Sequence, residues 1–393
     1  MPLVRLFSPT LLPLEENSMK KLLLASALMM ALLCATTALA AAPVKIGLMA
    51  PITGAFASEG QDMKKIVELM VEEVNKAGGI NGQMVELIVE DDGSTPRSAA
   101  TAASRLVAAG VPAAIGTYGS AVTQASQDIY DEAGVVQIAT GSTSIQLTAT
   151  GKKRFFRTCP RDDEQGRVAV ETLQKLGFNR VAILHDNSAY AKGLADEARQ
   201  LIESKKSAEI VFFDALVPGE RDYSAILTKI KGVNPEVIFF TGYYPEAGLL
   251  LRQMAAMKWS VPMIGGDATN NLDLVKIAGV DAAKGYRFIS PPMPSDIDSQ
   301  MARDFLAAYQ AKYNSLPSSI WSVMAGDAFN VLVAAIKAKG TDPAAITDYL
   351  HNDLKEFDSL TGKISFDEKG DRVGDLYRLY EVDAKGTFVL QPQ

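Results

Sequence analysis

Two stretches of this chain carry the same alternation of apolar strands and amphipathic helices. The first alternation opens at residues 44–49 and the second at 181–186, about 137 positions later. Strands that alternate with helices pair in parallel through right-handed crossovers, so each stretch predicts a doubly wound sheet of its own. Open parallel sheets bind ligands just past the carboxyl ends of their strands. The repeat therefore predicts an α/β protein with two parallel-sheet lobes and a small-molecule cleft between them.

Hydrophobic periodicity gives the expected elements of both stretches. In the first, strands are expected at 44–49, 84–89, 113–115 and 135–138, and helices at 61–76, from 96 onward, and at 123–132. In the second, strands are expected at 181–184, 209–213, 237–240 and 261–264, and helices at 191–204, 223–231 and 245–257. The acidic run at 90–92 is expected to end its strand, as a solvated strand end rather than a metal pair.

The pattern changes after residue 286. Helices are expected at 302–313, 322–337 and 344–354, followed by antiparallel strands near 363–367 and 376–382. These pieces must complete the two lobes, so the chain is expected to cross between them near 159–161, 290–292 and 367–372. We predict a first lobe of residues 41–161 plus 291–368 and a second lobe of 162–290 plus 369–393, joined by a multi-strand hinge.

The beginning of the chain has the pattern of a secretory signal peptide. Lys20 and Lys21 precede the apolar run 22–33, and a small-residue cleavage site ends at Ala40. The run is shorter than the roughly 20 residues that a permanent membrane helix needs, and no later run is expected to reach that length. We expect residues 1–40 to be removed on export to the periplasm, with Met19 as a second candidate start. Cys34 follows a leucine, which disfavours lipid attachment.

Charge and reactive residues exclude several classes of protein. The chain carries a net charge of −7, and residues 41–393 carry −8, because the first 40 residues hold three basic and two acidic side chains. A nucleic-acid partner needs clustered Lys and Arg, so it is not expected. Only Cys159 remains after cleavage, which excludes an internal disulfide and favours a buried apolar role over a nucleophile. His185 and His351 lack metal-ligand spacing, so no metal is expected.

Familiar catalytic motifs are missing from the sequence. It contains no G-x-S-x-G elbow, no Walker A loop and no G-x-G-x-x-G fingerprint. We therefore expect neither catalysis nor a cofactor. A secreted α/β enzyme that uses Cys159 or Asp267 is the alternative from another class.

Six loops follow predicted strands and are expected to line the cleft. They are residues 50–54, 116–120, 139–144, 186–190, 241–246 and 265–269. The first three are rich in hydroxyls and glycines, whereas the last three supply tyrosines and carboxylates. Anion donors on one wall and a carboxylate on the other suit a zwitterionic ligand.

Single residues in these loops each have a second interpretation. Ser120 precedes a predicted helix, where free N–H groups favour an anion, so it binds a ligand carboxylate or caps the helix. Thr143 has the same two roles open to it. Asp267 accepts from a ligand ammonium or caps a helix near Asn270. Tyr190 and Tyr243 close over a ligand or pack as half-buried rings.

At these loops the chain resembles the periplasmic branched-chain amino-acid (Leu/Ile/Val) binding proteins of ABC transporters, which have the type I solute-binding fold. The resemblance runs from about Val44 to Val382. It is carried by residues 77–82, 90–92, 127–130, 185–186 with Tyr190 and 193–195, and 212–214. The most specific stretch is 242–246 with 251–253.

The resemblance implies a protein that holds an amino acid between its lobes and delivers it to membrane permease subunits. By position, Ser120 would bind the ligand carboxylate, and Thr143 would serve both charged ends of the ligand. The Gly141 carbonyl would accept from the ammonium, and Tyr243 would reach the carboxylate from the opposite lobe. The remaining predicted ligand-binding residues are Ser142 in the same loop, Tyr190 as a cover, Asp267 in place of a family glutamate, and Glu59.

Four departures from the family pattern bear on the ligand. Asp267 is one methylene shorter than the expected glutamate. By the same resemblance, Glu59 stands where relatives in this family place an aromatic wall against the ligand side chain, and Ser319 replaces a bulkier residue. Ser94 and Gly119 occupy the positions of the family's disulfide. A branched-chain or similar aliphatic amino acid is the expected ligand, with an amide, a urea-like compound or an aromatic acid as alternatives. We expect a monomer that closes on its hinge.

Overall fold

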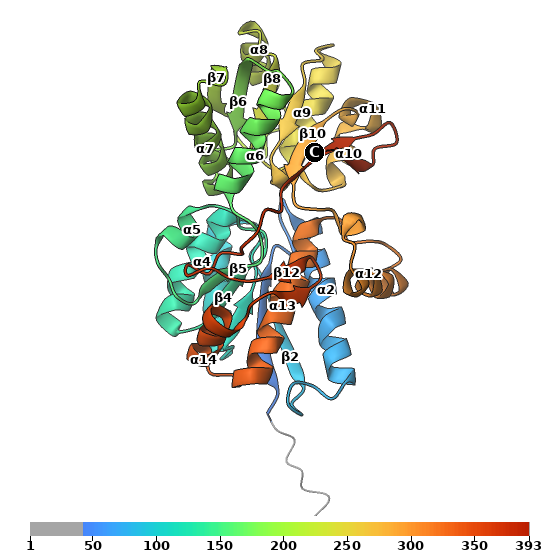
Figure 1. Cartoon of the computed structure of the whole chain (residues 1–393). Coiled ribbons are helices and arrows are strands. Elements are labelled where there is room, and N and C mark those ends of the chain that lie inside the picture. The colour runs from blue at the N-terminus through green and yellow to red at the C-terminus, as the bar shows by residue number, and fades with distance from the viewer. Residues whose placement is uncertain (1–41, 393) are drawn as a thin grey trace, which may run out of the picture. The chain divides into compact units, whose positions relative to one another are not determined.

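The computed structural model of the chain describes residues 42–392 (Figure 1). From Pro43 onward these residues form one compact unit. Its two larger sheets have five and seven strands, most of them parallel, which confirms the predicted α/β fold. The predicted signal peptide, including Met19 and Cys34, lies outside the described residues.

The first sheet is parallel throughout and has the strand order β2-β1-β3-β4-β5. Its strands are β1 (Val44–Ala50), β2 (Val85–Asp91), β3 (Ala113–Ile115), β4 (Val136–Ala139) and β5 (Phe155–Arg157). The associated helices are α2 (Ala57–Lys76), α3 (Pro96–Ala108), α4 (Ser120–Ala133) and the short α5 (Gln146–Ala149). The apolar residues of β1, β3 and β4 are buried, as expected for strands covered on both faces.

Two boundaries in this sheet differ from the sequence prediction for local reasons. Strand β2 runs on through Glu90 and Asp91, because the Asp91 carboxylate accepts from the Thr53 N–H and hydroxyl and ties the strand end to the neighbouring loop. Helix α2 starts at Ala57 rather than 61, so its first turn already includes Glu59.

The second sheet has the order β14-β13-β10-β9-β8-β6-β7. Its strands are β6 (Arg180–His185), β7 (Glu209–Ala215), β8 (Val237–Phe240), β9 (Met263–Gly265), β10 (Arg287–Ser290), β13 (Arg378–Val382) and β14 (Phe388–Leu390). Its helices are α6 (Asp162–Lys175), α7 (Ala189–Lys205), α8 (Ser224–Gly232), α9 (Tyr244–Ala256), α10 (Asp273–Ala278) and α11 (Val280–Ala283), with the 3₁₀ turn η1 (Asp267–Thr269). β13 is antiparallel to β10 and β14, as predicted for the region near 376–382.

The remaining segments follow β10. They are η2 (Pro294–Asp296), α12 (Gln300–Tyr313), α13 (Ile320–Lys339), α14 (Pro343–Asp348), η3 (Tyr349–Asp353) and the hairpin β11 (Phe357–Ser359) and β12 (Gly362–Ile364). Helices α13 and α2 lie side by side although some 260 residues separate them in sequence (Figure 1).

Within the described part of the chain, α13 is the one helix long and apolar enough to cross a membrane by length and composition. This contradicts the expectation that no later run reaches that length. Of its most apolar 18-residue window, 83% is buried inside the protein, so α13 serves as a core helix.

The chain passes between the two sheets more than once. It leaves the first sheet after β5 and forms β6 to β10 of the second. Helix α13 then packs against β3 and β4 of the first sheet, and β13 and β14 rejoin the second. The lobe boundaries at 161/162, 290/291 and 368/369 stay a prediction.

Candidate functional site

Ser120 is the first residue of α4 and does not cap it. The N-cap is Gly119, and no side chain caps this helix, so the capping interpretation of Ser120 is wrong. The buried Ser120 hydroxyl instead accepts the N–H of Ser144 at 3.2 Å. It therefore joins the β3–α4 loop to the β4–α5 loop, and its own proton is left for an acceptor at the positive end of α4.

The β4–α5 loop is held in one conformation by its small residues. A Cβ at Gly141 would stand 2.7 Å from a ring carbon of Tyr118, so glycine is required there. The Ser142 hydroxyl pairs with that of Thr123 at 2.6 Å and reaches the Thr117 carbonyl at 3.2 Å. Ser142 thus fixes the loop through its side chain, while its neighbour Thr143 carries the free hydroxyl.

Thr143 and Asp162 are neighbouring buried residues, and each has one side-chain oxygen without a hydrogen-bond partner. Thr143 Oγ1 and Asp162 Oδ2 are both buried and bonded to nothing. The hydroxyl lies near enough to lower the pKa of the Asp162 carboxyl, but the two atoms miss hydrogen-bond geometry. The Asp162 N–H donates to the Thr143 carbonyl at 3.0 Å, which keeps the pair together. Two orphaned polar atoms in one place favour an additional donor.

Asp267 comes from the second sheet and is connected to Asp162 through one amide. Gln165 Nε2 donates to Asp267 Oδ2 at 2.8 Å and to Asp162 Oδ1 at 3.0 Å. The Tyr377 hydroxyl donates to the same Asp267 oxygen at 2.8 Å. The Asp267 side chain caps no helix, so that interpretation of the residue is wrong.

The two aspartates make this part of the site electronegative. Burial raises the pKa of both carboxyls, and the Asp267 charge raises that of Asp162 further. Arg157 lowers the pKa of Asp162 again. Among the residues that the structure describes, neither aspartate forms an ion pair. Such a pair of carboxyls suits a bound cation, because a positive charge favours their ionised forms.

Aromatic side chains close the space between the loops of the two sheets. The Tyr243 ring lies 4.4 Å from that of Phe56 and 5.3 Å from that of Tyr190, centroid to centroid. The Tyr243 hydroxyl is 3.8 Å from where a Cβ on Gly119 would stand, beside Ser120. The Tyr190 hydroxyl accepts the Ala268 N–H at 3.4 Å, next to Asp267. Tyr190 and Tyr243 are therefore buried, one beside the loop of Asp267 and the other beside the start of α4.

Glu59 lies at the start of α2, fully buried. Its Oε1 accepts from Asn271 Nδ2 at 2.6 Å and its Oε2 from the Ser319 hydroxyl at 2.5 Å. Burial raises the pKa of the Glu59 carboxyl to about 8. The hydrogen-bond partners of Glu59 are thus Asn271 and Ser319 and none of the other seven predicted residues.

Sequence reasoning missed Asp162, Gln165 and Tyr377. The acidic run 162–164 in the first turn of α6 is a helix-start signal that would have revealed this helix. Tyr377 joins the site from more than 100 positions beyond Asp267, and no local pattern predicts that contact.

The surroundings of Cys159 do not activate its thiol as a nucleophile. Its thiol is fully buried and donates to the Ser142 carbonyl, and burial raises its pKa to about 12. Because the thiolate is the reactive form of cysteine, a thiol with a raised pKa is a poor nucleophile. The burial of Cys159 agrees with the buried apolar role expected from the sequence. Within the described residues no group of His, Cys, Asp and Glu side chains could hold a metal ion.

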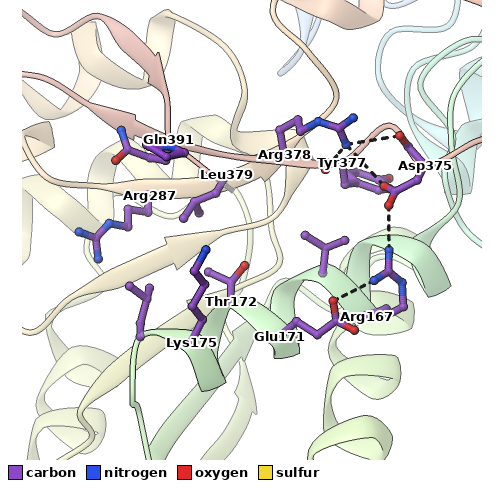
Figure 2. A pocket seen from close by; sticks show the side chains of 13 residues that line it. Arg167, Glu171, Thr172, Lys175, Arg287, Asp375, Tyr377, Arg378, Leu379 and Gln391 are labelled. Atoms are coloured by element: carbon purple, nitrogen blue, oxygen red, sulfur yellow. Dashed lines mark hydrogen bonds and ion pairs between the residues drawn. The ribbon is translucent and has the colours of Figure 1, made fainter.

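A separate surface pocket of about 360 Å³ lies behind Tyr377 (Figure 2). Figure 2 shows Arg167 of α6 between Glu171 and Asp375, with which it forms ion pairs at 2.8 and 3.2 Å. None of the eight predicted site residues lines this pocket. Of the residues that line this pocket, Tyr377 is the one that also hydrogen-bonds Asp267.

Comparison with known proteins places the chain in a family. The sequence profile described as periplasmic binding protein matches residues 43–387. The Leu/Ile/Val-binding protein BraC3 of Rhizobium johnstonii is 36% identical over 350 residues, covering 88% of this chain and 93% of that protein.

Two solved structures support the same family assignment. LivJ of Streptococcus pneumoniae, a branched-chain amino-acid transporter substrate-binding protein in complex with isoleucine, is 31% identical with a TM-score of 0.78, covering 89% of this chain and 100% of that one. The leucine-binding protein LivK of Thermotoga maritima is 28% identical with a TM-score of 0.81, covering 89% and 98%. These matches confirm the predicted resemblance and the type I fold, and the chain belongs to the periplasmic binding protein family.

Proposed function

We propose that this chain captures an amino acid, branched-chain or similarly aliphatic, and delivers it to the membrane permease of an ABC transporter. The names and bound ligands of its relatives support the ligand class. The observation that carries the proposal is the buried Thr143 hydroxyl near Asp162, whose carboxyl shares the Gln165 amide with Asp267. One oxygen of Thr143 and one of Asp162 have no hydrogen-bond partner, and neither aspartate forms an ion pair with a described residue. A ligand ammonium supplies the missing donor and the missing positive charge.

The two ends of the ligand meet different groups. The carboxylate binds at the start of α4, where the Ser120 hydroxyl and the free backbone N–H groups donate. Tyr243 reaches it from the second sheet. The ammonium binds Thr143, the Gly141 carbonyl and the two aspartates.

Closure follows docking in this proposal. The ligand first meets the loops of Ser120 and Thr143, and the second lobe then rotates onto it. Charge-assisted hydrogen bonds strengthen as water is excluded. The predicted crossings near 159–161, 290–292 and 367–372 form the hinge.

The ligand leaves unaltered, so the protein acts as a carrier and not as an enzyme. It is a periplasmic monomer whose signal peptide is cleaved after Ala40.

Calorimetry on residues 41–393, refolded from denaturant to remove co-purified ligand, tests the function. Titration with the twenty amino acids should give saturable heat with a subset of them. Absence of binding across that panel would overturn the proposal.

A further inference from the structure

The surface pocket of about 360 Å³ behind Tyr377 has walls from three parts of the chain. One wall is α6, the second is formed by β13 and the start of β10, and the third is the end of the chain after β14. Helix α6 packs against β10, and the Gln391 N–H donates to the Leu379 carbonyl at 2.9 Å, which holds the end of the chain along β13. The volume lies in the range of about 300–1,000 Å³ that is typical of ligand pockets.

The charged side chains at one end of this pocket neutralise one another (Figure 2). Arg167 forms ion pairs at 2.8 Å with Glu164 and with Glu171. The two oxygens of Asp375 pair with Arg167 at 3.2 Å and with Arg378 at 3.6 Å. A cationic ligand therefore finds no free carboxylate at this end, because each carboxylate that lines the pocket already has a positive partner.

Lys175 and Arg287 supply the pocket with donors that the protein does not use. Glu171, one helical turn before Lys175, pairs with Arg167 and Lys205 instead, and the Lys175 ammonium has no ion pair or hydrogen bond with any described residue. Arg287 donates to Glu381 through Nε at 2.7 Å, which leaves its two terminal nitrogens. Figure 2 shows both side chains on the side of the pocket away from the ion pairs of Arg167. Two cationic groups with free donors suit a carboxylate.

Apolar side chains make up much of the remaining lining of the pocket. They are Val168 and Leu176 of α6, Leu379 of β13, and Pro392. Leu176 is 36% exposed, although it is a large apolar side chain. A hydrocarbon body in the pocket would remove such surface from water, which is favourable, whereas an inorganic anion would leave it exposed.

We propose that this pocket is a second ligand site, which binds an aliphatic carboxylate. The carboxylate group accepts from the Lys175 ammonium and from the terminal nitrogens of Arg287, and the hydrocarbon body packs on the apolar side chains. None of the eight residues predicted to hold the amino acid lines this pocket, so the proposal does not depend on the proposed function.

Four small probes separate the contributions of charge and hydrocarbon. Calorimetry on residues 41–393 should give saturable binding of one octanoate per chain. Octanol, which lacks the charge, and octylammonium, which reverses it, should each bind about tenfold more weakly or less, because neither accepts charge-assisted hydrogen bonds from both cations. Acetate should also bind about tenfold more weakly or less, because it lacks most of the hydrocarbon.

Each of the opposite results would overturn the inference. They are no binding of octanoate, equal binding of octanol or octylammonium, which would leave an apolar or acidic pocket, and equal binding of acetate, which would leave a site for anions alone. None of these probes is an amino acid, so such a failure would leave the proposed function intact.

Variants of Lys175 then assign octanoate to this pocket. Lys175→Met should weaken octanoate binding about tenfold, and Lys175→Arg, which keeps the positive charge, should stay within about threefold of wild type. The melting temperature should not change, because this exposed side chain has no partner to lose. Lys64→Met is the matched control, because Lys64 is an exposed lysine of α2, paired with Glu68 at 3.7 Å, that does not line the pocket. Unchanged octanoate affinity in Lys175→Met would place the probe elsewhere and overturn the assignment.

Discussion

Arg157 and Asp371 form a buried ion pair that ties the loop of Thr143 to the segment between β12 and β13. Arg157 Nε donates to Asp371 Oδ1, and both side chains are almost completely buried. The other guanidinium nitrogens donate to the carbonyls of Ser142 and Ser144 at 3.0 and 2.9 Å and to the Thr148 hydroxyl. Arg157 thus fixes the backbone on both sides of Thr143.

Replacing Asp371 should therefore destabilise the protein strongly. Asp371→Asn leaves the Arg157 charge buried without its counterion and also removes the 2.8 Å pair with Arg161. Breaking a buried pair in this way costs about 3–5 kcal/mol. Urea denaturation should show this loss in the free energy of unfolding. The control Asp375→Asn removes surface pairs with Arg167 and Arg378 and should cost only about 0–1 kcal/mol.

Removing the Thr143 hydroxyl should weaken ligand binding more than it weakens the fold. Thr143→Val keeps the side-chain shape and deletes an atom that has no hydrogen-bond partner in the ligand-free chain. We expect at least tenfold weaker amino-acid binding by calorimetry, equivalent to about 1.4 kcal/mol, with little change in melting temperature. Thr150→Val, at an exposed threonine after α5, should leave affinity unchanged. Unaltered affinity in Thr143→Val would argue against an ammonium at this hydroxyl.

The sequence predicted the sheets better than the side-chain contacts. The apolar runs of β3 and β8 predicted these strands to the residue, because a buried parallel strand has a strong local signal. The edge strand β5 and helix α6 were missed. β5 has three residues, and α6 begins with an acidic turn rather than an apolar one.

The sequence could not decide between capping and ligand binding for Ser120 and Asp267, because both residues stand beside predicted helix starts. A serine or an aspartate beside a predicted helix fits a cap by sequence alone. In the structure the Ser120 oxygen accepts from Ser144 and the Asp267 oxygen from Gln165 and Tyr377. These partners lie 24 to 110 positions away, and tertiary packing decides the choice.

Burial of Glu59 should make the ligand-free chain less stable as the pH rises. Its pKa is raised from 4.5 to about 8, so the folded state binds the proton more tightly than the unfolded state. The contribution is fully present below pH 4.5 and is lost between about pH 4.5 and 8, by at most about 1.4 kcal/mol per pH unit. Urea midpoints measured from pH 5 to 8 should fall more steeply for wild type than for Glu59→Gln. Parallel pH profiles of the two proteins would contradict this.

Ligand binding should release protons near neutral pH if the ammonium meets Asp162 and Asp267. Burial raises the pKa of both carboxyls in the free chain, and an adjacent positive charge lowers it again. Binding therefore tightens as the pH rises through this range. Calorimetry in buffers of different ionisation enthalpy measures the number of protons released, which should fall in Asp162→Asn. Asp163→Asn is the matched control, because Asp163 is the partly exposed neighbour paired with Arg161, and proton release there should equal that of wild type. Proton release that Asp162→Asn leaves unchanged would place the bound charge away from this carboxyl.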